Sequence, residues 1–405
     1  KRGVSESVLL NCAVKNVQNA KLAEDGFYRV ELPSSLYNCS LAANINTTEF
    51  YYSVIPKSMK DLYVSLGMAK YERPNVMHGL ENRQILKNML CVRYQSDKKG
   101  ITVNEDALPV GYTYDKIMHK EDYDSLTPLE RQAALLEYAV LDEDGEKILE
   151  QQEKTFENGK SPSDDTITHG DLKITESDRA SYKGSRLKGK KHGKINLKFR
   201  TEKKSETYLV LKGLSSRSKV RKKQILSVKS KKARFEIPMC AVSNEKEMNR
   251  DFIAVNLGVA QMGTCSLCFH KSHTYKLNDM EIRGISESFI KEQTKERREE
   301  SMTEVKQSTN RISGKISVSE DKILQLAVPY SEGWHIYIDG KEAKTFTSSV
   351  AYTGVLIEKG EHTVEMHYIS PWIIPGTVLS VAAWIWMALS FAVKKRRISA
   401  DKRIK

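Results

Sequence analysis

The strongest chemical signal in this sequence of 405 residues is a basic window that runs from Lys183 to Arg234. The window holds 20 Lys and Arg against two acids, so it carries +18 in a chain whose net charge is +13. Clustered cations attract phosphates by long-range steering and by release of counterions. The alternative is that these cations lie on solvated loop tips without a ligand. The candidate polyanion-binding residues are Lys188, Lys190, Lys191, Lys219, Arg221, Lys222 and Lys223.

Three aromatic residues form a second candidate group. Tyr330, Trp334 and Tyr337 lie close together in the sequence and are candidates for contact with sugar rings. Aromatic residues at alternating strand positions also form core contacts or cross-strand pairs, and that alternative stays open.

The stretch Cys265–His273 contains four possible metal ligands, but their spacing argues against a zinc site. In a strand Cys265 and Cys268 point to opposite faces, and the two histidines follow too closely to close a finger. The sequence also contains no nucleophile elbow, phosphate loop or HExxH motif. We therefore predict no metal, no other cofactor and no catalytic residue in this chain.

An uncharged stretch near the end of the chain determines where these side chains lie relative to a membrane. Residues Trp372 to Val393 form 22 positions without a charge. As a helix they span roughly 33 Å, enough for a hydrocarbon core of about 30 Å. A basic tail follows, and such tails stay on the cytoplasmic side. We therefore predict that residues before Trp372 are extracytoplasmic, where an anionic envelope polymer is a more natural partner than nucleic acid.

Local patterns predict an α+β fold. A mixed first lobe contains helices near residues 58–66 and 80–90, and a third that begins at Thr127, where Pro128 and Glu130 complete a capping box. Short strands at intervals of roughly ten residues then indicate an antiparallel β-sandwich. Two later hairpins are expected, with turns at Asp339-Gly340 and Lys359-Gly360.

The changes of pattern divide the chain into eight segments. Because residue 1 is Lys and no signal peptide precedes the outward-facing part, we expect the chain to be the C-terminal portion of a longer membrane protein. The predicted segments are a juxtamembrane lead-in (1–25), a mixed α+β lobe (26–145), an acidic linker (146–165), a β-sandwich lobe with basic loops (166–285), a charged helical bridge (286–310), a β-hairpin part completing the β region (311–370), a transmembrane helix (372–393) and a basic cytoplasmic tail (394–405).

Seven short segments occur in a recognisable order: Phe27-Tyr28-Arg29-Val30, Phe50-Tyr51-Tyr52-Ser53, Leu90–Tyr94, Ala107–Tyr112, Val328–Trp334, Asp339-Gly340-Lys341 and Lys359–His362. Taken together, they resemble the YfhO family of bacterial membrane proteins. The resemblance implies a polytopic protein similar to GT-C glycosyltransferases, which uses a polyprenyl-phosphate-linked sugar outside the membrane and decorates envelope polymers such as lipoteichoic acid. In such enzymes the catalytic acid lies between N-terminal helices that this chain lacks, so no catalytic residue is transferred.

Two functional hypotheses follow. The first is an accessory extracytoplasmic part of such a transferase, which positions the acceptor polymer, with the sugar donor bound by the parent protein. The alternative is a non-enzymatic, membrane-anchored surface binding or adhesion protein. Wall-anchored proteins of that kind carry an LPxTG-type signal, whereas residues 373–377 read IIPGT. The oligomeric state is open.

Overall fold

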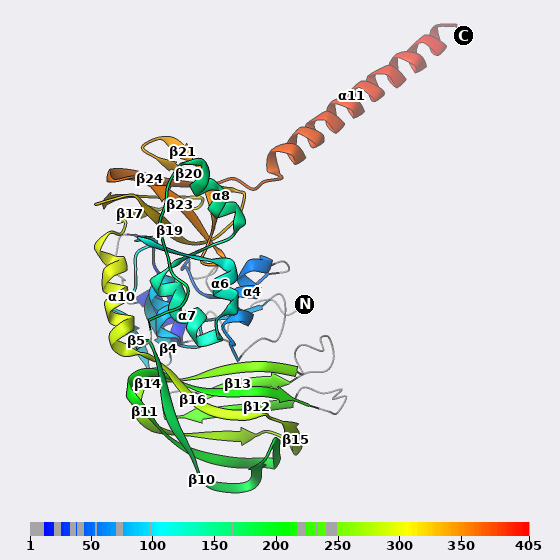
Figure 1. The fold of residues 1–405 in the computed structure, drawn as a ribbon. Helices are drawn as coiled ribbons and strands as arrows, with labels where there is room; N and C mark the ends of the chain where they lie inside the picture. Colours follow the sequence, from blue (N-terminus) through cyan, green and yellow to red (C-terminus); the bar gives the residue numbers. More distant parts are fainter. Residues whose placement is uncertain are drawn as a thin grey trace.

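The computed structural model describes residues 12–19, 26–32, 38, 44–52, 55–69, 76–97, 99–163, 165–216, 224–231, 234–239 and 249–404. They form an elongated body of helices and several β-sheets, from which one long helix, α11 (Ile373–Ile404), projects (Figure 1). The fold is α+β, as the sequence predicts. We call residues 165–286 the distal lobe, because they lie at the end of the body away from α11.

Short helices pack in the middle of the body, and three of the five lie where the sequence predicts helices. The helix that begins after Thr127 has the predicted capping box, in which the Thr127 N–H donates to Oε2 of Glu130 at 2.7 Å. This box supplies partners for N–H groups that the first helical turn leaves free. The helices of the region are α2 (Cys12–Asn19), α4 (Lys57–Ser65), α5 (Gln84–Met89), α6 (Lys120–Ser125) and α7 (Pro128–Glu137).

One seven-stranded sheet combines strands that precede the distal lobe in the sequence with strands that follow it. β6 pairs with β19, and β8 pairs with β22, so residues 111–158 and 322–357 build the same sheet. The predicted segments 26–145 and 311–370 therefore share a core rather than packing as separate units. In order, the strands are β6 (Gly111–Tyr114), β19 (Lys322–Pro329), β23 (Tyr352–Ile357), β22 (Thr345–Ser348), β8 (Ala139–Leu141), β7 (Lys116–His119) and β9 (Glu157–Asn158).

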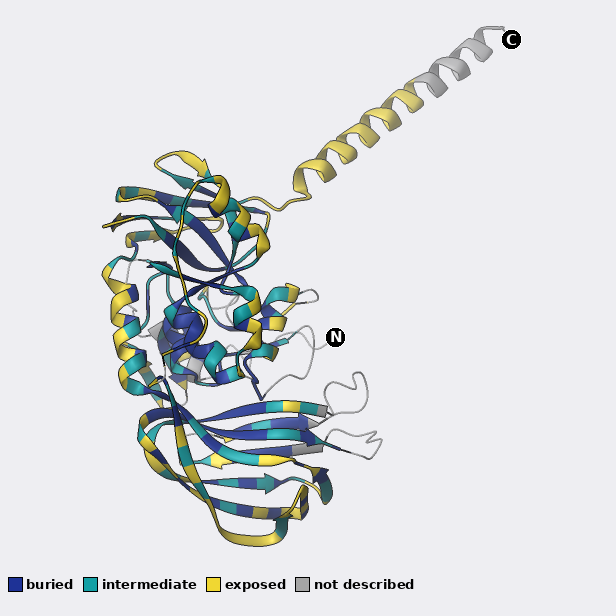
Figure 2. Ribbon diagram, viewed as in Figure 1, coloured by how far each residue is buried: buried dark blue, intermediate teal, exposed yellow. Residues whose placement is uncertain are grey.

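A five-stranded sheet lies beside it and contributes to the same core (Figure 2). The Asp339-Gly340 hairpin is confirmed, with φ of 51° and 77° at these residues. The prediction of a hairpin at Lys359-Gly360 is wrong. Strands β23 and β24 belong to different sheets, and the chain crosses from one sheet to the other at this dipeptide. In order, the strands are β17 (Thr303–Gln307), β18 (Arg311–Val318), β24 (Gly360–Tyr368), β20 (Trp334–Ile338) and β21 (Lys341–Ala343).

Two small sheets complete the middle of the body. β1 pairs in parallel with β4, and an antiparallel pair lies nearby in the sequence. Leu32, Val30 and Tyr94 pack with Val14 and Val17 of α2 in a small separate core. The strands are β1 (Arg29–Glu31), β4 (Val92–Asp97) and β5 (Gly100–Val103) in one sheet, and β2 (Glu49–Tyr51) and β3 (Val76–His78) in the other.

The distal lobe is built from long strands, which corrects the expectation of short ones. Residues 194–200 and 207–212, which have the patterns of two short strands, are parts of one 30-residue strand, β11. The described strands form one hydrogen-bonded sheet, so the sandwich stays a prediction. In order, they are β10 (Ile167–Lys183), β16 (Asp279–Ser286), β11 (Arg186–Ser215), β14 (Asn249–Phe269), β12 (Gln224–Ser230) and β13 (Arg234–Met239), with β15 (His273–Lys276) paired to β11.

Two helices and one strand lie where the sequence predicts connections. The predicted acidic linker overlaps helix α8 (Glu143–Gln151), which Asp142 caps by accepting the Gly145 N–H at 3.0 Å. The first part of the predicted charged bridge (286–310) is a helix, α10 (Glu287–Glu299). Residues near the end of that segment form strand β17 instead. In Figure 1, α10 runs from the distal lobe toward the sheets near α11.

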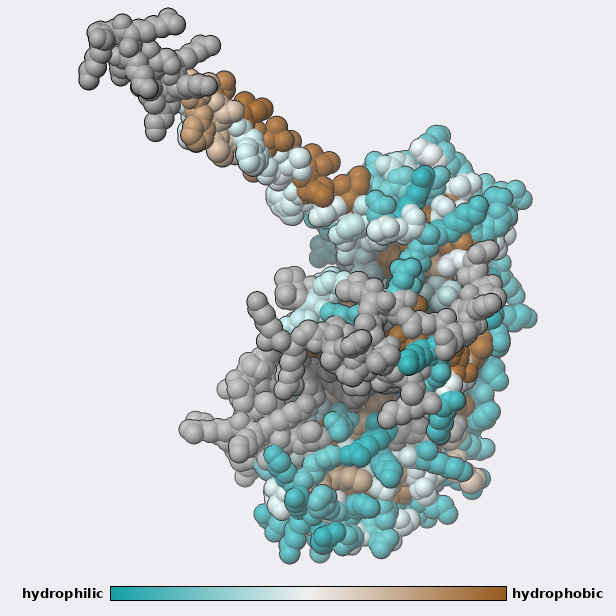
Figure 3. All heavy atoms as spheres, turned by 180° about the vertical axis from the view of Figure 1, so that it is seen from behind, coloured by the Kyte–Doolittle hydropathy of each residue, from teal (hydrophilic) through white to brown (hydrophobic). Residues whose placement is uncertain are grey.

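Helix α11 has the length and composition of a membrane span. Residues Ile373–Ala392 have a mean hydropathy of 1.7 and none of this segment is buried against the body. Figure 3 shows apolar side chains along the described part of α11, in contrast to the hydrophilic surface of the distal lobe.

Candidate functional site

The solvent face of β11 carries a row of cations, which we call the basic face (Lys188, Lys190, Lys194, Lys198 and Arg200). The side chains alternate, as in any strand, so that Leu187, Ile195, Leu197 and Phe199 enter the core of the distal lobe while these cations are exposed. None of the five makes an ion pair with another described residue. The basic face is therefore a surface with a net positive charge and without ion pairs among the described residues.

Neighbouring strands do not neutralise this surface. Lys173 of β10 lies directly opposite Lys198, and like charges in such a position repel each other. Asp178 lies opposite Lys194 and Asp171 opposite Arg200, so two acids are near. Neither acid lies within ion-pair distance of the cation opposite it. An arrangement with this many unpaired cations is suited to binding an extended anion.

The structure describes only part of the predicted polyanion site. Lys188 and Lys190 belong to the basic face, and Lys191 is exposed beside them, with its N–H donating to Oγ of Ser272 at 3.0 Å. The other predicted residues lie outside the described ones: Lys219, Arg221, Lys222 and Lys223. Three predicted cations are thus brought together, and the sequence did not single out Lys194, Lys198 or Arg200, although alternation along a strand could have indicated them.

The Cys265–His273 stretch does not gather its side chains at one point. Cys265 is buried in the distal core, whereas Cys268 lies on the opposite face of β14. His270 contacts Ser227, and His273 forms a hydrogen bond with Ser216, which directly follows β11. Among the described residues, no group of three or more His, Cys, Asp or Glu side chains is placed to hold a metal ion.

The three predicted aromatic residues do not form one platform. Trp334 and Tyr337 lie on opposite faces of β20, and Tyr337 packs against His367 with ring centroids 5.3 Å apart. Trp334 packs edge-on against Tyr368 at 5.0 Å and lines a groove of about 1310 Å³. Tyr330 is half-buried, and it is not among the residues that line this groove. Only Trp334 therefore remains a candidate for contact with a ligand in the groove.

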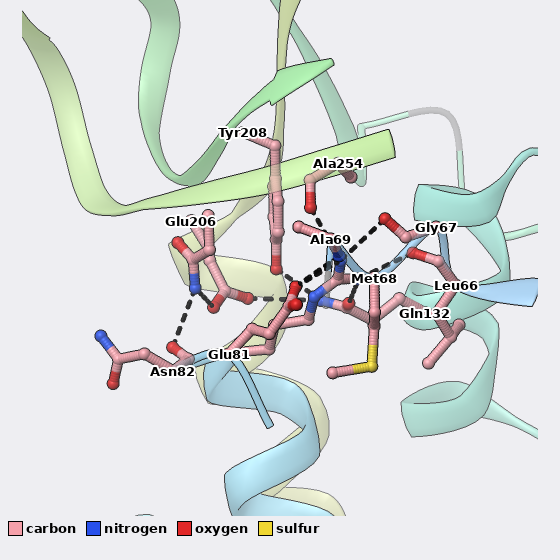
Figure 4. A network of polar contacts seen from close by, with 12 residues as sticks. Leu66, Gly67, Met68, Ala69, Glu81, Asn82, Gln132, Glu206, Tyr208 and Ala254 are labelled. Carbon is pink, nitrogen blue, oxygen red and sulfur yellow. Dashed lines mark hydrogen bonds and ion pairs between the residues drawn. The ribbon is translucent and has the colours of Figure 1, made fainter. Parts of the chain in front are cut away.

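A buried polar network fixes the distal lobe to the middle of the body (Figure 4). Arg83 is fully buried, and its guanidinium donates to the Leu66 carbonyl (2.8 Å), to Oε1 of Gln132 (2.8 Å) and to the Ala254 carbonyl of β14 (2.9 Å). Glu81 lies 3.7 Å from the same guanidinium, and its side chain is also buried. Because hydrogen bonds between buried groups are costly to break, this network holds the two parts in one orientation.

A second set of bonds centres on Glu206 of β11. Its carboxylate accepts hydrogen bonds from the Gln84 N–H and from Nδ2 of Asn256, which also donates to the Asn82 carbonyl at 2.8 Å. Burial raises the pKa of Glu206, and the hydrogen bonds from its neighbours oppose that shift without cancelling it. Sequence patterns did not indicate this network, because its members come from three separate segments.

Comparison with known proteins places the chain in a family. Residues 10–380 match the family described as "Bacterial membrane protein YfhO". The chain belongs to the YfhO family. YfhO of Bacillus subtilis (strain 168) is 22% identical over 142 residues, which are 35% of this chain and 16% of that protein. The matched part is therefore a small fraction of that relative's length. Together, the family and the apolar segment of α11 indicate an integral membrane protein.

Solved structures resemble the YfhO-family chain only distantly. A cycloisomaltooligosaccharide glucanotransferase from Paenibacillus sp. has a TM-score of 0.19 and 9% identity, over 50% of this chain and 45% of that one. The arabinofuranosyltransferase AftD from Mycobacteria has a TM-score of 0.17 and 8% identity, over 51% and 24%. Scores this low carry no argument about fold or function.

Proposed function

We propose that this chain is the extracytoplasmic C-terminal part of a YfhO-family glycosyltransferase. The parent protein uses a polyprenyl-phosphate-linked sugar and modifies an envelope polymer such as lipoteichoic acid, and this part holds the acceptor. Membership of a family of bacterial membrane proteins supports the setting. The sugar chemistry rests on the resemblance of the family to GT-C enzymes. The catalytic groups belong elsewhere in the parent protein.

The orientation is part of the same proposal. Helix α11 continues past its apolar segment into a basic end, and such ends stay in the cytoplasm. The body before α11 then faces outward, on the side where teichoic acids are found.

The basic face is the observation that carries the acceptor role. Its cations are spaced two or four residues apart along β11, so successive charges lie roughly 7 to 14 Å apart. A flexible polymer with one phosphate per repeat can place successive phosphates against such a row. The distal lobe is far from α11, so this contact would hold a part of the polymer remote from the membrane.

A retention experiment with the full chain in detergent tests this function. We expect immobilised poly(glycerol phosphate) teichoic acid to retain the chain at low salt and to release it at high salt. Each lost phosphate contact reduces the slope of log affinity against log salt by about 0.7, so a triple substitution reduces it by about 2. The test variant combines Lys188→Gln, Lys190→Gln and Lys194→Gln, and the matched control combines Lys160→Gln, Lys295→Gln and Lys341→Gln.

The control lysines are exposed and, like those of the basic face, make no ion pair with a described residue. They remove the same net charge, so a nonspecific effect of charge changes both variants equally. Equal slopes for the two variants would contradict the role of the basic face. Negligible retention of the unaltered chain at both salt concentrations would contradict acceptor binding altogether.

A further inference from the structure

The groove beside Trp334 is a second site, separate from the basic face. It has a volume of about 1310 Å³ and is formed by four segments: the chain around β1, the chain around β2, the β17–β18 hairpin, and the chain from the end of β19 to the start of β20. Three of them carry motifs of the family resemblance, Phe27–Val30, Phe50–Ser53 and Val328–Trp334. The lining residues used below are Phe27, Arg29, Phe50, Tyr52, Lys306, Arg311 and Trp334.

The groove combines aromatic rings with hydrogen-bonding groups. Phe50 and Tyr52 meet edge to face with ring centroids 5.4 Å apart, and 53% of Tyr52 is exposed. Amide and hydroxyl side chains lie among these rings: Asn44, Asn46, Thr47, Gln307, Ser308 and Thr309. Aromatic faces pack against the apolar faces of sugar rings, while amides and hydroxyls bond sugar hydroxyls. This composition suits a sugar better than a lipid chain.

Arg29 adds a positive charge that is held in place. Its guanidinium donates to the Leu90 carbonyl at 2.9 Å and the Ala327 carbonyl at 2.8 Å, and it lies 4.8 Å from the centre of the Phe27 ring. No described carboxylate lies within ion-pair distance of it. A guanidinium has five N–H donors, so Arg29 can still donate to an anion in the groove.

Other charges of the groove have the same sign. Lys306 is exposed and makes no ion pair with a described residue, whereas Arg311 pairs with Glu365. No Asp or Glu is among the described residues that line the groove. Charge-assisted bonds from arginine and lysine are strong with phosphate oxygens. The lining therefore favours a ligand that carries phosphate as well as sugar.

The groove also lies near the membrane end of the body. The Ile369 N–H donates to the Gly333 carbonyl at 2.8 Å, next to Trp334, and α11 begins at Ile373. A ligand at Trp334 is thus close to the start of the apolar segment, in contrast to a ligand on the basic face.

We propose that this groove binds a sugar-substituted glycerol-phosphate segment of the envelope polymer. The sugar packs against Tyr52 and Trp334, and the phosphate lies by Arg29 and Lys306. This site rests on the proposed function only for the identity of the polymer. The polymer would contact the chain twice, at the groove near the membrane and at the basic face far from it.

Binding of a short probe by the full chain in detergent tests the groove. The probe is a glucosylated glycerol-phosphate trimer, and calorimetry measures its affinity. Tyr52→Ala is expected to weaken binding by about fivefold to a hundredfold, the range for loss of one aromatic stacking contact. Tyr51→Ala is the matched control, because Tyr51 is the adjacent residue, is 45% exposed and does not line the groove. It should change affinity by less than about twofold.

A second pair of variants tests the phosphate contact without relying on stacking. Lys306→Ala should weaken the dependence of binding on salt, and Lys341→Ala should leave it unchanged. Equal affinities of the Tyr51 and Tyr52 variants would overturn the proposal. It would also fall if the neutral gluco-oligosaccharide bound as tightly as the trimer, or if only a short-chain polyprenyl-phosphate glucose bound.

The experiments can contradict the groove and the basic face independently of each other. Retention of the long polymer with no binding of the trimer would remove the groove and leave the proposed function intact. Binding of the trimer that depends on Tyr52, without the effect of the basic-face variant, would remove the distal contact and support the groove.

Discussion

Replacement of Arg83 by methionine should loosen the attachment of the distal lobe. Methionine fills a similar length but has no donor for the Leu66 and Ala254 carbonyls or for Gln132. It also leaves Glu81, whose side chain is only 2% exposed, without its cation. The change therefore removes hydrogen bonds between the middle of the body and β14 and takes the guanidinium away from Glu81, which still accepts the Ala69 N–H at 2.9 Å.

The expected cost is about 3–5 kcal/mol, the range for removing one member of a buried ion pair. Part of this cost falls on opening of the contact between residues 66–69 and β14, where the Ala254 N–H donates to the Gly67 carbonyl at 2.8 Å. Because about 1.4 kcal/mol corresponds to a tenfold change in an equilibrium constant, a share of about 2.8 kcal/mol makes opening about a hundredfold more frequent.

Hydrogen exchange followed by mass spectrometry measures this opening. Protection of the Ala254 amide should fall by about a hundredfold or more in Arg83→Met. Arg131→Met is the control: Arg131 also bonds carbonyl oxygens, those of Tyr123 and Ser65, but it is partly exposed and does not reach β14. A decrease below about tenfold in Arg83→Met, or an equal decrease in both variants, would refute the reasoning.

Two further predictions concern stability. Burial, and then repulsion by Glu31, raises the pKa of Glu49 well above 4.5. The folded chain then binds more protons than the unfolded chain above that pH, so the free energy of unfolding decreases as pH rises. Glu49→Gln keeps an acceptor for the Leu32 N–H, and should raise the melting temperature at about pH 8 more than at about pH 5; equal shifts would contradict this. Gly340→Ala should destabilise the chain by about 1–2 kcal/mol in denaturant unfolding, because φ is 77° and no atom lies within 4 Å of the added Cβ. Gly376→Ala, equally open but helical, should not destabilise it, and a similar loss in both would contradict the backbone explanation.

Features that depend on neighbouring residues were predictable. The capping box at Thr127 and the turn at Asp339-Gly340 need only a few adjacent side chains, and both are present. The same kind of reasoning failed at Lys359-Gly360. That dipeptide does turn the chain, but whether the next strand pairs with the previous one depends on which sheet receives it.

Strand length was not predictable from the basic window. Gly189 and Gly193 suggest turns, yet both lie inside β11. Only glycine fits at position 189, because a Cβ atom there would lie 2.4 Å from the Phe269 ring. This contact joins segments that are far apart in the sequence. Glycine thus marks close packing here, and the alternation of cations and apolar residues was the better guide.

The sequence by itself determined the membrane segment and the excess of positive charge in one region, because hydropathy and charge are sums over neighbouring residues. Tertiary structure alone decided that the cations form a row at the far end of the body, and that Arg29, Tyr52, Lys306 and Trp334 line one groove. Those residues are brought together by strand pairing and packing across most of the chain, and no local pattern encodes which distant segments meet.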